Sequence, residues 1–230
     1  GSGQVEAAGD DGDVFADLLI SGPHSDGNTF TADLLPGGGA SFPAAINIGN
    51  ISALGGVEIT GLPVLHAFPQ LHGAGDFNGD GLDDIMVGSL TLGEADFILG
   101  SANLSNATAL SFKITDSAGI FFSASDSPLG DFNGDGYDDV ILSSKYEDSD
   151  FVVFGQGGST NISTSSLNGS NGFAITGAAN TYAGYSVSGV GDINGDGYDD
   201  AVSLSKTTAS IVFGHSGASP ASLSTASLNG

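Results

Sequence analysis

The sequence predicts an all-β fold assembled from about four repeats, each of the size of one β-propeller blade. Two observations predict it. An Asp-rich segment recurs along the chain, and the apolar residues fall in short runs bounded by Gly, Asn or Ser. A third observation agrees, because no segment combines the helical period of apolar residues with helix caps.

Three Asp-rich segments align with one another without gaps. They span Gly75–Asp84, Gly130–Asp139 and Gly191–Asp200, and each precedes a short apolar run. The common pattern is Gly-Asp-Phe/Ile-Asn-Gly-Asp-Gly-Leu/Tyr-Asp-Asp, and the first aspartates are 55 and 61 residues apart. After each of the three segments, a later apolar run ends in Phe-Gly or in the similar pair Leu-Gly. The chain is therefore an array of similar units.

A fourth, degraded copy lies near the N-terminus, ahead of an apolar run at 18–20, with Val14 in place of a glycine. Its acidic residues are Asp10, Asp11, Asp13 and Asp17. The copies divide a single repeat domain, residues 1–230, into approximate units 1–66, 67–120, 121–180 and 181–230. Four short strands in each unit suit a propeller blade, because a blade buries both sheet faces against its neighbours.

Charge excludes some functions. The chain has 27 acidic residues against three Lys or Arg, a formal net charge of −24 at pH 7. With so few cations, it is not expected to bind nucleic acid. No apolar run approaches the roughly 20 residues of a membrane helix, so membrane insertion is not expected either. The acidic residues are a solubility device for salty surroundings or, in part, metal ligands.

The spacing inside each intact loop indicates a calcium site. Side-chain oxygens fall at positions 1, 3, 5 and 9 of the loop, position 7 offers its carbonyl, and glycines at positions 4 and 6 allow a tight wrap. Oxygen-only donors with several carboxylates suit Ca²⁺. We therefore expect three Ca²⁺ ions, and the degraded copy is a candidate for a fourth. The expected ligands are Asp76, Asn78, Asp80, Leu82, Asp84; Asp131, Asn133, Asp135, Tyr137, Asp139; and Asp192, Asn194, Asp196, Tyr198, Asp200.

Two other interpretations of the loops fit the sequence less well. A single Asn-Gly-Asp-Gly segment also suits a hairpin turn, but three copies with the same oxygen positions favour ion binding. An EF-hand needs a Glu at position 12 and flanking helices, whereas these flanks read as strands. Position 8 is acidic in each loop and is expected to face outward or to support a turn. Its residues are Asp83, Asp138 and Asp199.

On these residues the chain resembles the FG-GAP repeats of integrin α-subunit propellers. The Asp-rich pattern before an apolar strand and the later Phe154-Gly155 carry the resemblance, and the segment 166–173 looks especially like the bacterial repeats. The resemblance implies a calcium-binding β-propeller of the integrin-α type. Propellers of that family usually have seven blades. About four units therefore suggest part of a longer repeat chain, an incomplete propeller, or two copies that together close a ring.

The resulting prediction is a non-enzymatic module, extracellular or at the cell surface, that serves adhesion or scaffolding while calcium keeps a structural role. Its partner would be a protein or a carbohydrate at a cell surface, or a second copy of the chain. One alternative is an architectural subunit of a surface layer or filament. Another is a propeller-based enzyme acting on polysaccharide, although the sequence offers no convergent polar cluster outside the loops.

Overall fold

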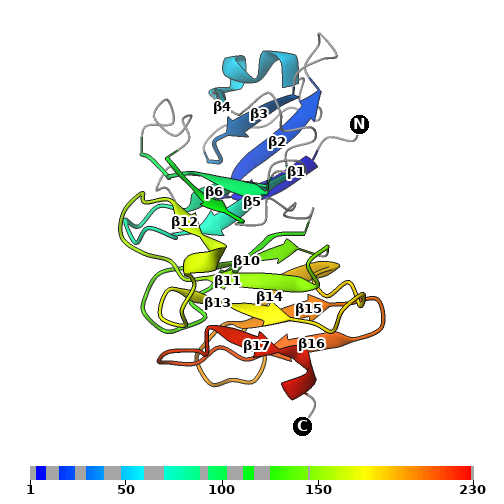
Figure 1. Ribbon diagram of the computed structural model, residues 1–230. Helices are drawn as coiled ribbons and strands as arrows, with labels where there is room; N and C mark the ends of the chain where they lie inside the picture. The colour runs from blue at the N-terminus through cyan, green and yellow to red at the C-terminus, as the bar shows by residue number, and fades with distance from the viewer. Residues whose placement is uncertain are drawn as a thin grey trace.

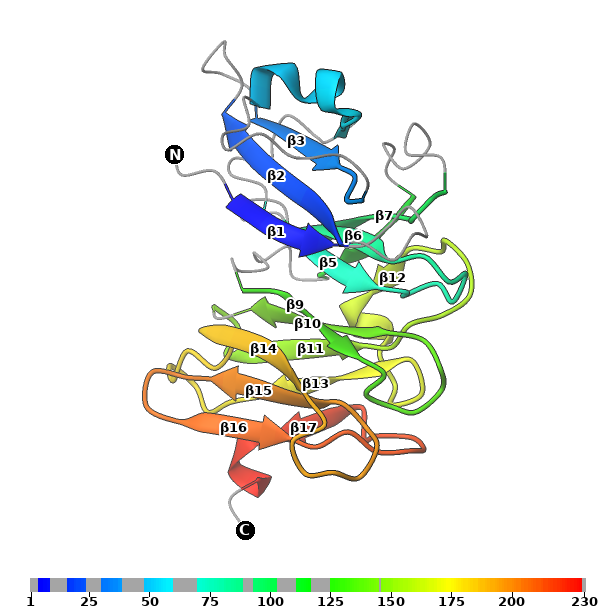
Figure 2. The same ribbon diagram turned by 180° about the vertical axis from the view of Figure 1, so that it is seen from behind.

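Four β-sheets follow one another along the chain and stack face to face, with the first and the last at opposite ends of the molecule (Figures 1 and 2). The predicted all-β class is confirmed. This computed structural model describes residues 4–8, 16–23, 30–38, 48–59, 70–88, 93–102, 111–116, 125–144 and 146–228. None of the helices in these ranges is both long and apolar enough to cross a membrane.

The strands of the first sheet, and all those of the second except β12, come from the N-terminal half of the chain. The first has the order β1-β2-β3-β4, and the short 3₁₀ helix η1 (Ile48–Leu54) precedes its last strand. Its strands are β1 (Gln4–Ala8), β2 (Asp17–Pro23), β3 (Phe30–Leu35) and β4 (Val57–Ile59). The second sheet has the order β12-β8-β7-β6-β5. Its strands are β5 (Gln70–Gly75), β6 (Asp84–Gly88), β7 (Glu94–Ile98), β8 (Phe112–Thr115) and β12 (Ile162–Ser163).

The third and last sheets complete the stack. The third has the order β17-β13-β11-β10-β9, and the last has the order β14-β15-β16. The strands of the third are β9 (Ser127–Gly130), β10 (Asp139–Ser144), β11 (Ser149–Val153), β13 (Gly172–Thr176) and β17 (Ser222–Ser224). Those of the last are β14 (Ser186–Gly191), β15 (Asp200–Leu204) and β16 (Ala209–Val212). Short 3₁₀ helices η2 (Thr164–Ser166) and η3 (Thr225–Ser227) follow β12 and β17.

Two short strands cross from one repeat to the sheet before it. β12 follows β11 in the chain, yet it pairs in parallel with β8 of the second sheet. β17 follows β16 and pairs in parallel with β13 of the third sheet. Each crossing adds a strand to the outer edge of the preceding sheet, so backbone hydrogen bonds tie neighbouring sheets together in addition to side-chain packing.

Side chains of the inner strands alternate between the two neighbouring sheets. In β10, Val140 and Leu142 pack with residues of the second sheet, whereas Ile141 packs with residues of the last. All six residues of β10 are buried as a result. A strand covered on both faces needs apolar residues at consecutive positions, which explains the short continuous runs in the sequence.

A buried carboxylate lies between the third and last sheets, away from the Asp-rich loops. Asp150 accepts a hydrogen bond from the Ser203 hydroxyl, and in the described part of the structure its Oδ1 has no hydrogen-bond partner. Burial is the main cause that raises the pKa of Asp150 to about 7, because the charged form is poorly solvated there.

This pKa predicts a pH effect on stability. A carboxyl whose pKa rises on folding stabilises the fold fully below its unfolded pKa, and that contribution is lost as pH rises through the folded value. We compare the free energy of unfolding of Asp150→Asn with that of the wild type at the two pH values. The value for the variant minus that for the wild type should be at least about 1 kcal/mol larger at pH 8 than at pH 5. Urea unfolding at fixed calcium measures it, with the exposed Glu58→Gln as control. An unchanged difference between the two pH values would contradict the prediction.

Candidate metal centres

The three intact loops occupy equivalent places at one edge of consecutive sheets. Each connects the first strand of its sheet to the second: β5 to β6, β9 to β10, and β14 to β15. Their glycines at positions 4 and 6 have φ between 74° and 95°. This left-handed conformation is readily adopted by glycine and rarely by other residues, so the local sequence selects the same tight wrap three times.

Side chains at positions 1, 3 and 5 of each loop turn back onto the loop's own backbone. In the first loop, the backbone N–H of Asp80 donates to Asp76 Oδ1 at 2.9 Å and to Asn78 Oδ1 at 2.8 Å. The N–H groups of Gly81 and Leu82 donate to Asp76 Oδ2 and Asp80 Oδ1 at 2.8 and 3.0 Å. The same four bonds recur in the other two loops at 2.8–3.1 Å. Sequence spacing therefore gathers the predicted side-chain oxygens around one short stretch of backbone.

The carboxylate at position 9 is fully buried and joins the loop to its sheet. One oxygen accepts the N–H of the glycine that follows the third strand, an interaction we call the Asp–Gly tie. The three pairs are Asp84–Gly100 at 2.8 Å, Asp139–Gly155 at 2.8 Å and Asp200–Gly214 at 2.9 Å. The other oxygen accepts an N–H from within the loop, at 2.9–3.2 Å.

The degraded first copy keeps this tie. Asp17 is buried, and the N–H of Gly37 donates to its Oδ1 at 2.6 Å. Strand register places Gly37 where the other sheets have their tie glycine, because Leu18 pairs with Leu35 as Ile85 pairs with Ile98. Gly37 follows Pro36, so no Phe-Gly pair marks this position. The remaining residues proposed for a fourth ion, Asp10, Asp11 and Asp13, lie outside the described residues.

Acidic side chains of one loop act on each other electrostatically. Burial first, and repulsion from Asp80 and Asp76 in addition, raise the pKa of Asp84 to about 7. In the second loop, burial and the charges at positions 1 and 5 raise the pKa of Asp139 to about 8. In the third loop, hydrogen bonds led by the Gly197 N–H lower the pKa of Asp192. A cation among these groups would favour their charged forms.

Position 8 links consecutive loops, which the sequence did not indicate. Asp138 Oδ2 accepts the N–H of Asp76 at 2.8 Å, and Asp199 Oδ2 accepts the N–H of Asp131 at 3.0 Å. The backbone N–H groups of Asp138 and Asp199 also donate to the carbonyls of Asp76 and Asp131. The expectation that position 8 faces outward is wrong for these two residues, because each contacts position 1 of the preceding loop.

Position 7 adds a second link through its aromatic ring. A Cβ built on Gly79 would lie 2.3 Å from Tyr137 Cε1, and one built on Gly134 would lie 2.4 Å from Tyr198 Cε1. The ring of one loop therefore lies against the glycine at position 4 of the loop before it. Gly195 has nothing within 4 Å of such a Cβ, so only the third loop leaves this glycine open.

The predicted side-chain ligands at positions 1, 3, 5 and 9 thus bond to the backbone of the same loop, but the acidic groups alone do not form a complete metal site. Within the part of the chain that the structure describes, no three Asp, Glu or His side chains meet in a metal-binding arrangement. Each predicted site also draws on an Asn side chain and a backbone carbonyl. The donors of the three loops are all oxygen atoms, which fits a hard cation such as Ca²⁺ by chemistry.

Comparison with protein families agrees with the resemblance seen in the sequence. Residues 124–163 match the family model described as FG-GAP repeat, so the predicted resemblance is confirmed over that segment. The match contains the whole second loop, its Asp–Gly tie and the crossing strand β12. Comparison with curated proteins returned no match.

The ring contacts between loops predict a difference between two glycines with similar backbone conformation. Gly134 and Gly195 have φ of 76° and 80°, so an alanine strains the backbone about equally at both sites. Gly134→Ala must in addition displace Tyr198, and we expect it to destabilise the protein by about 1–3 kcal/mol more than Gly195→Ala. Urea unfolding at constant calcium measures both variants, and equal losses would argue against the contact.

Proposed function

We propose that the chain is a calcium-binding, extracellular module of the integrin-like β-propeller type, which acts as a non-enzymatic scaffold in adhesion while calcium keeps a structural role. One observation carries the proposal: three loops fold through the same hydrogen bonds and gather oxygen donors at the same edge of three stacked sheets. The FG-GAP match over the second loop supports the class of module.

Calcium would stabilise more than the loop that holds it. The loop oxygens come from Asp and Asn side chains and from the carbonyls of Leu82, Tyr137 and Tyr198. An ion there offsets the repulsion among carboxylates and holds positions 1 to 9 together. The backbone N–H of position 1 donates to the carboxylate of position 8 in the next loop, and the carbonyl of position 1 accepts the N–H of that position 8 residue. A bound ion therefore stabilises the contact between two sheets, which suits a rigid scaffold.

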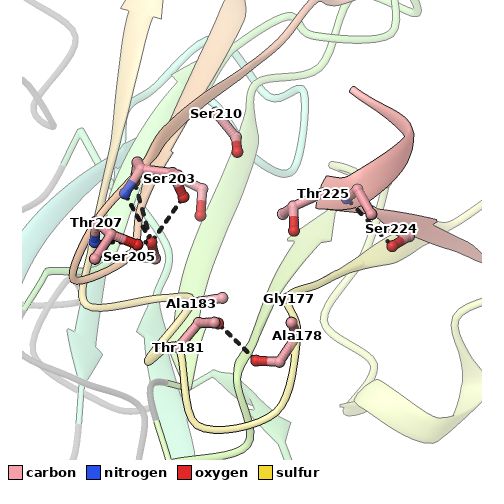
Figure 3. Close-up of a pocket in the computed structure, with 12 residues that line it drawn as sticks. Gly177, Ala178, Thr181, Ala183, Ser203, Ser205, Thr207, Ser210, Ser224 and Thr225 are labelled. Carbon is pink, nitrogen blue, oxygen red and sulfur yellow. Dashed lines mark hydrogen bonds between the residues drawn. The ribbon is translucent and has the colours of Figure 1, made fainter. Parts of the chain in front are cut away.

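A cavity between the third and last sheets bears on the enzyme alternative. It has a volume of about 270 Å³, and its lining is mainly hydroxyl groups and small residues from β15, β16, the turn between them, β17, η3 and the segment 177–183 (Figure 3). It forms where Ser203 and Ser210 replace the larger Leu142 and Phe151 of the third sheet. Its lining residue Ser203 donates a hydrogen bond to the buried Asp150, so the enzyme alternative would depend on this pair.

Calcium titration of the full chain tests the proposal. After treatment with EDTA and dialysis, isothermal titration with Ca²⁺ should show about three sites, and the melting temperature should rise with the ion. Each site contributes about 2.7 kcal/mol of stability when free calcium is 100-fold above its dissociation constant. An unchanged melting curve in EDTA and in calcium would contradict structural calcium.

A single-charge variant locates the sites. Asp135→Asn removes an exposed carboxylate from position 5 of the second loop, so it should remove or weaken one site and leave two. Glu58→Gln removes one exposed charge from β4 and should leave all sites intact. Equal titrations of the two variants would argue against binding in the loop.

A further inference from the structure

The third and last sheets meet through a more polar interface than the second and third sheets do. Three residues of the apolar core between the second and third sheets have polar counterparts one repeat further along the chain. The exchanges are Ala95 to Asp150, Leu142 to Ser203 and Phe151 to Ser210. All of them lie near the strand ends away from the Asp-rich loops. Polar groups therefore replace apolar packing at this end of the interface.

A hydroxyl-lined cavity of about 270 Å³ takes the place of the missing apolar side chains (Figure 3). Eight of its 12 lining residues are Ser or Thr, and the other four are Gly or Ala. Ser203 is 2% exposed and lies on β15, the central strand of its sheet. A Ser or Thr hydroxyl can both donate and accept a hydrogen bond, so the lining offers both kinds of group.

One wall of the cavity is held by strained backbone. In the segment 177–183, Asn180 and Tyr182 donate their N–H groups to the carboxylate of Asp148. The φ angles of Asp148, Asn180 and Tyr182 are 53°, 65° and 55°, in a region that residues other than glycine rarely adopt. Such strain persists only where the surrounding structure holds it, and it clusters at functional sites. The ring of Tyr182 also lies against Lys206, whose Nζ is 3.4 Å from the ring centroid. The wall is therefore fixed by contacts outside the cavity.

A buried carboxylate orients the hydroxyl of Ser203. Because Ser203 donates its proton to Asp150, its lone pairs remain as acceptors. Asp150 is fully buried, and in the described part of the structure its second carboxylate oxygen has no hydrogen-bond partner. A buried polar atom without a partner is rare in folded proteins. This end of the interface is therefore suited to polar contents rather than to apolar packing.

Charge and size narrow the class of ligand. None of the 12 residues described around the cavity is charged, and the net charge of −24 disfavours an anion. Without a carboxylate among these residues, a metal ion would lack its usual oxygen ligands. The volume of about 270 Å³ lies just below the range of about 300–1,000 Å³ for pockets that hold drug-sized ligands. One neutral sugar ring meets both limits, because it is small and its hydroxyl groups donate and accept as the lining does.

We propose that this cavity is a carbohydrate-binding site that takes one neutral sugar unit, free or at the end of a glycan. Ser203 accepts a hydrogen bond from a sugar hydroxyl, and Ser210 donates or accepts another. Methyl groups of the lining threonines and alanines contact the C–H groups of the ring. Adhesion through this site rests on the scaffold function proposed above, whereas the sugar binding itself uses none of the calcium loops. The sugar test and the calcium titration can therefore fail independently of each other.

An NMR titration of the ¹⁵N-labelled full chain with single sugars tests the site. At fixed calcium, at least one of glucose, galactose, mannose and N-acetylglucosamine should bind with a dissociation constant of about 1 mM, as expected for so small a ligand. Glucuronate is charged and should bind at least about tenfold more weakly than the best neutral sugar. A neutral oligosaccharide that ends in the best sugar should bind at least as tightly if the ligand is a glycan end, and more weakly if it is the free sugar. No binding of any neutral sugar, or equal binding of glucuronate, would overturn the proposal.

A cavity-filling variant locates the binding. Ser210→Phe supplies the ring that Phe151 has in the third sheet, and it should lower the affinity for the best sugar at least about tenfold by steric exclusion. Ser159→Phe adds the same ring at an exposed position in the connection after β11, and it should leave the affinity unchanged. Equal affinities of the two variants would show that the sugar does not bind in the cavity.

Amide shifts of the wild type keep the test valid if Ser210→Phe fails to fold. The best sugar should shift the amide signals of Thr181, Ser203 and Thr208, which line the cavity. The amide signal of Gly134, in the second Asp-rich loop, should stay unchanged. Shifts centred on Gly134, or spread evenly over the chain, would overturn the proposal.

Discussion

A buried aspartate that accepts the N–H of a glycine after the third strand is the interaction on which the rest of this structure depends. It recurs in all four sheets at 2.6–2.9 Å, from Asp17–Gly37 to Asp200–Gly214. A buried carboxylate is costly unless it is hydrogen-bonded, so each tie fixes the point where a loop enters its second strand. A Cβ on Gly155 would lie 2.8 Å from the Phe77 carbonyl of the preceding sheet. The tie glycine therefore also lets neighbouring sheets approach closely.

Loop geometry and sheet stacking are linked by this arrangement. With position 9 held in place, positions 1, 3 and 5 fold onto the loop backbone, and positions 7 and 8 reach the preceding loop. Loop shape and sheet contact are therefore coupled, and the proposed Ca²⁺ would act on both. Coverage differs between the first and last sheets: η1 packs on the first sheet, while Ile211 and Phe213 of the last repeat are exposed.

Local patterns made much of this predictable from the sequence. The loops, their glycines and the doubly buried strands such as β10 follow from spacing and from continuous apolar runs. Contacts between repeats were missed. β12 has only two residues, which is too short to show a strand period in the sequence. Its partner strand β8 belongs to the preceding repeat, so the pairing is not visible within one repeat. The tie glycine Gly37 follows a proline instead of a phenylalanine, so the sequence pattern does not mark it. In sequence, Asp138 looks like any exposed acidic loop residue, because its contact is with the preceding loop. The sheets stack as predicted for blades, but a closed ring is not seen among the described strands.

Hydrogen exchange at the tie glycine of the third sheet tests this dependence most directly. In ¹⁵N-labelled protein at fixed calcium, the Gly155 amide should exchange only through global unfolding, because it donates to a carboxylate that is fully buried. Asp139→Ala should raise the exchange rate of Gly155 and also that of the Gln156 amide, which donates to the Phe77 carbonyl in the sheet before it. Fast exchange of Gly155 in the wild type, or unchanged protection of both amides in Asp139→Ala, would contradict the account.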